Sequence, residues 1–494
     1  PGGTPDTFNM AVMGLRLGQR ANGVSRLHGD VSRGMFGALW PGFDQDDVPI
    51  TSVTNGVHAP TWTDPMLVDL AADRLGSGNT TTVDWNSPAV SDDDIWRVRG
   101  TMRSQLVDDA RRRVAEAWRE ENPGVGDPRW MGAILDPEVL TIGFARRVPT
   151  YKRLTLMLHD PERLRSLLLH PTRPIQIVIA GKSHPADEEG KRLIQKLVEF
   201  ASGADVRHRI VFLPNYDIAM AQVLYPGTDV WLNNPLRPLE ACGTSGMKAA
   251  LNGSLNLSIL DGWWAEFYDQ ENGWAIPSAD SAGDGAARDQ LEADAMYDLI
   301  EHQIAPRFYD QNDSGLPTRW VASIRHTLAT LSQPLSADRM VQEYVNRLYL
   351  PAAHAEALIS SSDFEPAREL AEWKRTVRDG WHNVQVVHVE SGGVDTVPQV
   401  GDSLHVRARV TLGDLRPSDL KVEVVYGQAQ DGDSLSKIKR HALTFESQEP
   451  GQAAVFAGTI TLERPGSFGY NVRVVPSHPL LATPAELGLI AVAH

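Results

Sequence analysis

One stretch of the chain, residues 233–261, holds the residue types and spacing best suited to chemistry. It contains a lone carboxylate, Glu240, then the run Gly-Thr-Ser-Gly from Gly243, and then Lys248. A strand, a glycine-rich loop and a helix in that order can form an anion site, because glycines let backbone N–H groups approach the ligand. We predict a helix at 247–251 with Lys248 in its first turn, where the helix dipole opposes a cation by roughly 0.3–1 kcal/mol. A lysine placed against that field suggests a phosphate contact, or a Schiff base with an aldehyde cofactor.

The same stretch also has an ordinary structural interpretation. Thr244 and Ser245 are common N-cap residues, and glycine-rich loops before helices are frequent. The spacing of a P-loop and that of a dinucleotide-binding loop are both absent, so these two readings are set aside. Cys242 has no His and Asp partners at readable spacing, and we interpret it as a small packing residue. The Trp263–Trp264 pair could stack on sugar or belong to the core.

A second group of residues places four cations within eight positions of an acidic chain. They are Arg146, Arg147, Lys152 and Arg153. Arginine forks match phosphate oxygens, and such charge-assisted hydrogen bonds are about twice as strong as neutral ones. Solvated basic helix ends are also common, so the pattern alone leaves a phosphate site and a plain surface both open.

Composition limits the classes of function. At 494 residues the chain is too long for one core, so about two to four domains are expected. Its 47 Lys and Arg against 63 Asp and Glu give a net charge of −16, which argues against nucleic acid or an anionic membrane as a general partner. No apolar run approaches the ~20 residues of a membrane span. The single cysteine excludes disulfides within the chain and fits a reducing, cytoplasmic compartment.

The elements that must position these residues alternate between strand and helix. Apolar runs predict strands at 139–145, 175–180, 210–213, 229–233 and 255–260, and helices at 151–169, 187–201 and 217–224. This pattern predicts an α/β fold with a parallel sheet covered on both faces. Ligands of such sheets bind beyond the carboxyl ends of the strands. The basic group and the loop that carries Glu240 and Lys248 both follow such ends.

The last third of the chain contains two further patterns. A helix is predicted at 336–350, with an apolar stripe that we interpret as core: Met340, Val341, Tyr344, Val345 and Leu348. A second helix is predicted at 365–378. After Gly380 the hydrophobic period becomes two, for example at Leu404, Val406, Ala408, Val410 and Leu412. We therefore expect an antiparallel β-sandwich of about 110 residues there.

Taken together, these residues resemble the α-glucan (glycogen, starch and maltodextrin) phosphorylase family, and its shorter bacterial branch most. The matching strings are NGVSRLHGDVSR, TNGVHAPTW, GFARRVPTYKR, IAGKSHPAD, FLPNYD and EACGTSGMKAALNGSLNLSILDGWW. They run in the family's order, and the last looks like its cofactor-lysine signature. The resemblance implies the C-terminal half of a two-domain GT-B glycosyltransferase fold, with a Rossmann-like sheet, followed by the β-sandwich.

The resemblance also implies a role for each matching residue, and no metal. Lys248 would hold pyridoxal 5'-phosphate as a Schiff base. The residues around that cofactor would be Thr244, Ser245, Arg146 and Tyr216. The residues that bind inorganic phosphate would be Arg147 and Lys152, which with Lys248 form the catalytic set. The residues that hold the glucosyl hydroxyls would be Glu240, Cys242, Gly243, Tyr151 and Asn55.

The implied reaction is reversible phosphorolysis of α-1,4-glucan from its non-reducing end, giving glucose 1-phosphate with retention. The cofactor phosphate would make the substrate phosphate more acidic, and the substrate phosphate would protonate the glycosidic oxygen. Glu240 shows no second carboxylate in a readable partner position, so a glycosidase pair is not predicted. Two alternatives are a nucleotide-sugar glucosyltransferase, which needs no cofactor lysine, and a non-catalytic glucan-binding protein.

Family members carry an N-terminal domain before the segment at which this chain begins, and it contributes to the catalytic cleft. We therefore expect the chain to be weakly active alone, and to act as a homo-oligomer or with the missing part. The expected division is a remnant of that domain with a helical interdomain segment at 1–132, a Rossmann-like cofactor- and phosphate-binding domain at 133–335, helices packing back on the core at 336–380, and the β-sandwich at 381–494.

Overall fold

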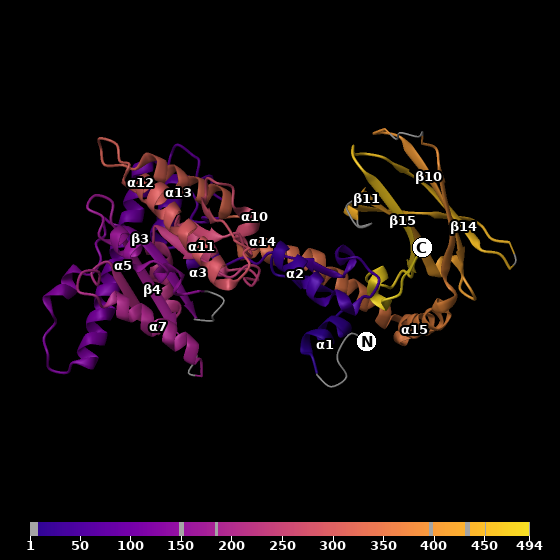
Figure 1. Ribbon diagram of the computed structural model, residues 1–494, viewed down its shortest axis with the longest axis horizontal. Helices are drawn as coiled ribbons and strands as arrows, with labels where there is room; N and C mark the ends of the chain where they lie inside the picture. Colours follow the sequence, from indigo (N-terminus) through magenta and orange to yellow (C-terminus); the bar gives the residue numbers. More distant parts are fainter. Residues whose placement is uncertain are drawn as a thin grey trace. The chain divides into compact units, whose positions relative to one another are not determined.

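The computed structural model describes residues 8–147, 153–182, 186–394, 399–429, 435–449 and 451–493, with only the backbone at 146 and 147. The chain forms two compact units (Figure 1). The α/β unit comprises Gly23–Gly29 and Ser52–Tyr344. The β-sandwich unit comprises Pro1–Asn22, Asp30–Thr51 and Val345–His494. The predicted division into four segments remains a prediction.

The α/β unit is built on a six-stranded sheet in which every neighbouring pair of strands is parallel. Its strands are β3 (Leu140–Arg147), β4 (Ile175–Lys182), β5 (Ile210–Pro214), β6 (Val230–Asn233), β7 (Leu255–Ile259) and β8 (Gly273–Ile276). Their order across the sheet is β5-β4-β3-β6-β7-β8. Counted from β3, this is the order 3-2-1-4-5-6 of a doubly wound sheet. The predicted parallel sheet is confirmed.

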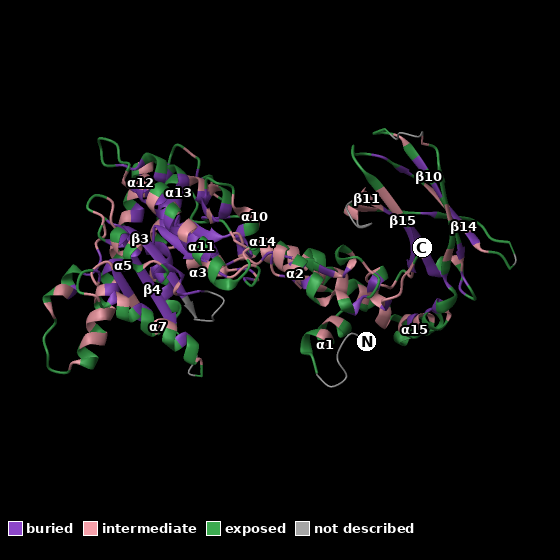
Figure 2. Cartoon of the chain, in the orientation of Figure 1, coloured by how far each residue is buried: buried purple, intermediate pink, exposed green. Residues whose placement is uncertain are grey.

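Alternate side chains of each strand enter different cores, as the period of two requires. Along β4, Ile177 and Ile179 join one cluster, while Val178 and Ala180 join the other. The second cluster contains apolar side chains of α5 and α8, and the first contains those of α11 and α13. Both faces of the sheet are therefore buried, and the strands lie in the purple interior of Figure 2.

The helices of this unit lie both before the first strand of the sheet and between and after its strands. They are α3 (Ala59–Trp62), α4 (Pro65–Leu75), α5 (Asp92–Glu121), α6 (Pro161–Leu168), α7 (Glu188–Ala201), α8 (Ile218–Gly227), α9 (Thr244–Ala250), α10 (Trp264–Phe267), α11 (Gly285–Leu299), α12 (Ala305–Tyr309), α13 (Thr318–Leu331) and α14 (Ala337–Tyr344). Helix α5 begins with a capping box, in which the hydroxyl of Ser91 accepts the Asp94 N–H and the Asp94 carboxylate accepts the Ser91 N–H.

A buried ionic cluster fixes α5 at the amino-terminal edge of the sheet. Arg103 lies 2.6 Å from Asp229, and Arg99 lies 3.7 Å from the same carboxylate. Arg99 also donates to the carbonyls of Pro226, Thr228 and Asn252. The other oxygen of Asp229 accepts the backbone N–H at the start of β3, 2.9 Å away. This cluster therefore joins α5 to the entries of three strands, β3, β6 and β7.

The β-sandwich unit contains two four-stranded antiparallel sheets, ordered β13-β14-β10-β9 and β12-β11-β15-β16. The strands are β9 (Gln385–Gly392), β10 (Ser403–Thr411), β11 (Leu420–Ala429), β12 (Leu435–Ala442), β13 (Thr444–Ser447), β14 (Ala454–Thr461), β15 (Phe468–Pro476) and β16 (Ala491–Val492). The alternating residues from Leu404 to Leu412 are buried in the core between the sheets. The predicted sandwich is confirmed.

Helices precede the sandwich in the same unit. They are α1 (Met10–Leu17) and α15 (Leu350–Gly380); α2 (Arg26–Phe36) and the short pair β1 (Ala21–Gly23) and β2 (Ile50–Ser52) complete the elements. Helix α15 is interrupted at Ser361–Phe364, where three residues have positive φ. Arg440 and Arg473 bind Asp47, which attaches the segment 30–51 to the sandwich.

Two predictions about helices are wrong. The helix expected at 151–169 begins only at Pro161, after a short 3-10 turn at Leu156–Leu158. Arg153 has a φ of 48°, which no helix accommodates. The stripe in 336–350 does lie on helical chain, but it is not core: α14 and the turn after it have no buried residue, and Val341 is 51% exposed.

In the described part of the chain no helix is both long and apolar enough to cross a membrane. No group of three or more His, Cys, Asp or Glu side chains there is placed to hold a metal ion.

Candidate active site

The candidate site lies at the carboxyl edge of the parallel sheet, around the point where the strand order reverses between β3 and β6. In doubly wound sheets ligands bind at this switch point. Arg146 and Arg147 are the last residues of β3, and Asn233 ends β6. The loop after β6 carries Glu240 and leads into α9, which carries Lys248. The topology therefore brings both sequence motifs to one edge of the sheet.

Helix α9 starts earlier than predicted, and this changes the argument about Lys248. Gly243 is its N-cap, with a φ of 88°, and the helix runs from Thr244. Lys248 therefore lies in the last turn, where the helix dipole favours a cation. Position 246 lies within the helix and is a glycine because a Cβ there would lie 2.5 Å from Asn256 Oδ1. The helix dipole does not oppose Lys248, so its position in the helix gives no reason to assign it a function.

The surroundings of Lys248 supply a different reason. Its Nζ lies 3.6 Å from the centre of the Trp62 ring and 5.6 Å from that of the Tyr225 ring. Among the described residues no carboxylate forms an ion pair with this half-buried amine. Desolvation by burial lowers the pKa of Lys248 below its ordinary value. An amine with a lowered pKa is more often neutral, and therefore more nucleophilic, than a surface lysine.

Asn252 fixes the relation between the lysine and the tryptophan. Its side-chain amide donates to the carbonyl of Trp62 at 2.7 Å and to the carbonyl of Lys248 at 2.8 Å. Its oxygen accepts the N–H of Asp64 at 2.7 Å. Asn252 is fully buried. One side chain thus joins the end of α3 to the end of α9 and sets where the amine meets the ring.

Two tyrosines extend the aromatic surface that Trp62 presents to Lys248. The hydroxyls of Tyr216 and Tyr225 are 2.6 Å apart. The Tyr225 ring packs edge-on against Trp62, with centroids 5.8 Å apart. Ser245 accepts a hydrogen bond from the Trp231 indole at 3.3 Å, so its hydroxyl is anchored to β6. The structure therefore gathers Tyr216, Ser245 and Lys248 around one aromatic cluster, although they come from three different segments.

The loop 240–243 is held by three hydrogen bonds. The N–H of Glu240 donates to Asp261 at 3.0 Å, the Ser25 hydroxyl donates to the Ala241 carbonyl at 2.7 Å, and the Trp263 N–H donates to the Cys242 carbonyl at 2.9 Å. Asp261 also accepts the N–H of Gly262 at 2.8 Å. The backbone of this loop is therefore fixed, as a recognition site requires.

Asp261 is a second buried carboxylate that sequence reasoning missed. Burial and the charge of Glu240 raise the pKa of Asp261 to about 6, although the two backbone hydrogen bonds act to lower it. Both of its oxygens accept these loop N–H groups, so it positions the loop. Glu240 itself is buried, and its carboxylate packs against Gly243, since a Cβ built there would lie 3.2 Å from Glu240 Oε1.

Asn55 and Cys242 meet at the side of this loop. The Cys242 thiol is buried in an apolar cluster and interacts with the backbone of Asn55. Burial raises its pKa to about 12, so the thiol is not a nucleophile. The Asn55 carbonyl accepts from Arg339 at 3.1 Å. Asn55, Glu240, Cys242 and Gly243 are thus brought together, while Trp263 and Trp264 are both core residues.

Part of the predicted site cannot be placed. Tyr151 and Lys152 lie outside the described residues, as do the side chains of Arg146 and Arg147. Arg153 has a structural role and does not contribute to a phosphate site, because its guanidinium group is already paired. It is paired with Glu292 at 2.5 Å and Asp289 at 2.9 Å, and it also donates to two backbone carbonyls.

Besides Asp261, sequence reasoning missed three residues that shape the candidate site: Trp62, Tyr225 and Asn252. Each lies far along the chain from at least one residue that it contacts, for example Trp62 and Lys248, so no local spacing could reveal them. The sequence contained one signal, since Trp62 closes the string TNGVHAPTW.

Comparison with known proteins gives the family. The model of the "Carbohydrate phosphorylase" family matches residues 3–272, and that of the "Glycogen phosphorylase C-terminal domain" matches 381–494. A glycogen phosphorylase of Mycobacterium tuberculosis is 52% identical over 99% of this chain and 57% of its own length. A maltodextrin phosphorylase of Thermococcus litoralis is 33% identical over 98% of this chain and 57% of its own length.

A glycogen phosphorylase of Aquifex aeolicus is 40% identical over 69% of this chain and 49% of its own length. The chain thus spans little more than half of the curated relatives that it matches. The family model alone covers more than half of the chain. The chain belongs to the carbohydrate phosphorylase family.

Proposed function

We propose that this chain supplies the cofactor-binding part of a pyridoxal-phosphate-dependent α-glucan phosphorylase of the shorter bacterial branch, with a GT-B architecture. The reaction is the reversible phosphorolysis of α-1,4-glucan from the non-reducing end, which gives glucose 1-phosphate with retention. The single observation that carries this proposal is Lys248: a half-buried amine on a tryptophan ring, at the switch point of a doubly wound sheet. Family membership and the names of the relatives support it.

The residues around Lys248 fit an aldehyde cofactor. Attachment requires a neutral amine, and burial lowers the pKa of Lys248 in that direction. An ammonium kept for structure would be expected to pair with a carboxylate, and none of the described ones does so. Lys248 would hold the cofactor through its amine, and Arg146 with Thr244 and Ser245 would bind its phosphate. Tyr216 would line its wall.

When bound, the cofactor would supply a phosphate group that makes the neighbouring substrate phosphate a stronger acid. The chain's own residues would do the rest. Arg147 and Lys152 would bind the substrate phosphate and offset its charge, as arginine forks do well. Arg147 ends β3, beside the switch point, and Lys152 follows it five positions later in the sequence. They would hold the phosphate where it can give a proton to the glycosidic oxygen and then stabilise the positive charge that develops on the sugar.

Recognition of the glucosyl hydroxyls would fall to the loop 240–243, together with Asn55 and Tyr151. Glu240 is buried, so it would gain more from a sugar hydroxyl than an exposed carboxylate would. Asp261 does not turn Glu240 into half of a glycosidase pair, because both Asp261 oxygens already accept loop N–H groups. The nucleophile in this proposal is therefore phosphate and not a protein carboxylate.

The test uses the purified chain and pyridoxal phosphate. Bound cofactor absorbs in the near ultraviolet or violet, and borohydride reduction followed by peptide mass mapping locates the lysine that holds it. We expect the label on Lys248 alone, loss of the absorbance in Lys248→Ala, and no change in Lys196→Ala, an exposed lysine on α7. Labelling of other lysines at the same rate, or no labelling, would overturn the proposal. Release of glucose 1-phosphate from glucan and phosphate, by the protein in its active assembly, tests the reaction itself.

A further inference from the structure

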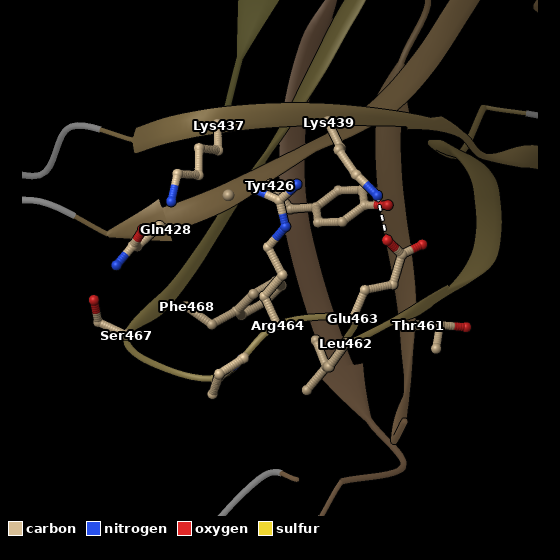
Figure 3. Close-up of a pocket in the computed structure, with 12 residues that line it drawn as sticks. Tyr426, Gln428, Lys437, Lys439, Thr461, Leu462, Glu463, Arg464, Ser467 and Phe468 are labelled. Atoms are coloured by element: carbon tan, nitrogen blue, oxygen red, sulfur yellow. Dashed lines mark hydrogen bonds and ion pairs between the residues drawn. The ribbon is translucent and has the colours of Figure 1, made fainter. Parts of the chain in front are cut away.

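One feature that the proposed function leaves unused is a pocket at one end of the β-sandwich. It has a volume of about 270 Å³ and lies between strands β11 and β12 of one sheet and the segment 461–468, which leaves β14 and enters β15. Figure 3 shows it with its lining side chains. It belongs wholly to the β-sandwich unit.

The floor of the pocket is apolar and aromatic. Leu462 is buried in the sandwich core, and Tyr426 packs against that core. The rings of Tyr426 and Phe468 lie 6.1 Å apart at an angle of 46°. Phe468 comes from β15 and stays 37% exposed. An exposed aromatic ring above an apolar floor offers a surface on which a sugar or nucleoside ring can stack.

The rim of the pocket is cationic, although the chain as a whole carries −16. Lys437, Lys439 and Arg464 line it, against a single carboxylate among its described lining residues, Glu463. Glu463 is already paired with Lys439. Within the described part of the chain neither Lys437 nor Arg464 forms an ion pair. In Figure 3 these two side chains reach into the pocket from opposite walls. Among the described residues, two cations without an ion-pair partner thus face one aromatic floor.

The pair of cations decides between the possible ligands. A neutral oligosaccharide is usually bound by carboxylates and amides, and here the one carboxylate among the described lining residues, Glu463, is paired with Lys439. The pocket lining also includes the side-chain amide of Gln428, which forms no hydrogen bond within the described residues, and the hydroxyls of Tyr426, Thr461 and Ser467. The volume is at the small end for a ligand pocket, so it fits one ring with one phosphate group better than a chain of sugars.

We infer that this pocket binds a phosphate monoester of a sugar or nucleoside, with the phosphate between Lys437 and Arg464 and the ring on Phe468 and Tyr426. The site lies in a different unit from the cofactor lysine and does not depend on the proposed function. A small phosphate ester bound there would be an effector or a ligand of a second binding site, and not the phosphate that reacts with glucan.

The experiment is isothermal titration of the full 494-residue chain with five probes: glucose 1-phosphate, glucose 6-phosphate, adenosine monophosphate, inorganic phosphate and maltotriose. The variants are Lys437→Gln/Arg464→Gln, Phe468→Ala and a matched control, Arg409→Gln, an exposed arginine on β10. Each changed residue is at least partly exposed, and thermal melting checks that the fold is kept. Comparing the sugar esters with adenosine monophosphate tells which ring the pocket prefers.

We expect at least one ring-bearing ester to lose about tenfold or more in affinity in the double variant, because two charge-assisted contacts disappear. Phe468→Ala should weaken the ring-bearing esters and leave inorganic phosphate unchanged, and Arg409→Gln should change neither. The inference is overturned if every ester binds the double variant within about twofold of the parent, if no ester binds at low millimolar concentration, or if maltotriose binds as well as the esters.

Discussion

Asp229 is the most informative residue to change for the stability of the α/β unit. Its carboxylate is fully buried between Arg99 and Arg103 and also accepts the N–H that opens β3. Asp229→Asn keeps the shape but removes the charge. One oxygen of the amide can still accept a hydrogen bond, while its NH₂ group must face a donor. The substitution therefore removes the carboxylate that two buried guanidinium groups share.

The magnitude follows from the geometry. Burial lowers the pKa of Arg99 to about 10 even with Asp229 in place, although the carboxylate acts to raise it. That shift corresponds to about 3 kcal/mol against the folded state, because one pKa unit is about 1.4 kcal/mol. Without the carboxylate the desolvation cost of both arginines is uncompensated. Breaking a buried pair by removing one partner costs about 3–5 kcal/mol, and we expect a loss in that range.

The assay must follow one unit at a time, because a chain of two units does not unfold in a single step. Native-state hydrogen exchange with mass spectrometry gives opening free energies for peptides from α5, β3 and β6. In Asp229→Asn these peptides should lose about 3–5 kcal/mol of protection, and peptides from the sandwich should not change. The matched control is Glu116→Gln, which breaks an exposed pair with Arg112 on the same helix and should leave the protection nearly unchanged.

A loss below about 1 kcal/mol in Asp229→Asn would refute the reasoning, since buried charges would then tolerate the loss of their partner. Equal losses in the sandwich peptides would refute it as well, because the effect would not be local to the α/β unit.

Three more predictions concern the loop that carries Glu240. Gly262→Ala should cost about 2–4 kcal/mol, because φ is +53° and the new Cβ would lie 2.3 Å from the Cys242 carbonyl oxygen; an unchanged melting temperature would contradict it. The Cys242 thiol, whose pKa is raised to about 12 by burial, should resist iodoacetamide in the native chain at pH 8 and react in urea, and fast native labelling would disprove this. The pKa of Asp261 is about 6 when folded against an ordinary 3.8, so the folded state favours the protonated form. Its contribution to stability is present below about pH 4 and lost as pH rises through 6, by about 3 kcal/mol in total. Unfolding titrations of the parent and Asp261→Asn should therefore diverge between pH 4 and 6, and parallel curves would exclude the effect.

The sequence predicts a structural element correctly where its apolar residues form a continuous run or repeat with one period over several residues. The parallel strands were found because each is a short apolar run, and the sandwich was found because Leu404 to Leu412 alternate strictly. The stripe from Met340 to Leu348 shows the limit of that signal. Periodicity identifies a face that could be buried, and it does not say whether anything covers it: Val341 is 51% exposed.

The site was recovered less completely, for physical reasons. The run Gly-Thr-Ser-Gly from Gly243 is typical of a loop, so the predicted helix begins at Met247 and places Lys248 in the first turn, whereas α9 begins at Thr244 and places it in the last turn. Gly246 is there for close packing, which only coordinates reveal. Arg153 resembled its basic neighbours, and its carboxylate partners Asp289 and Glu292 lie more than a hundred residues away.

The ionic cluster at Asp229 and the candidate site lie at opposite edges of the parallel sheet. The cluster anchors the strands where they begin, while Lys248 and the 240–243 loop occupy the edge where they finish. The residues that stabilise the sheet and those of the candidate site therefore form separate sets. Substitutions in the 240–243 loop can change the candidate site while the Asp229 cluster keeps the sheet folded.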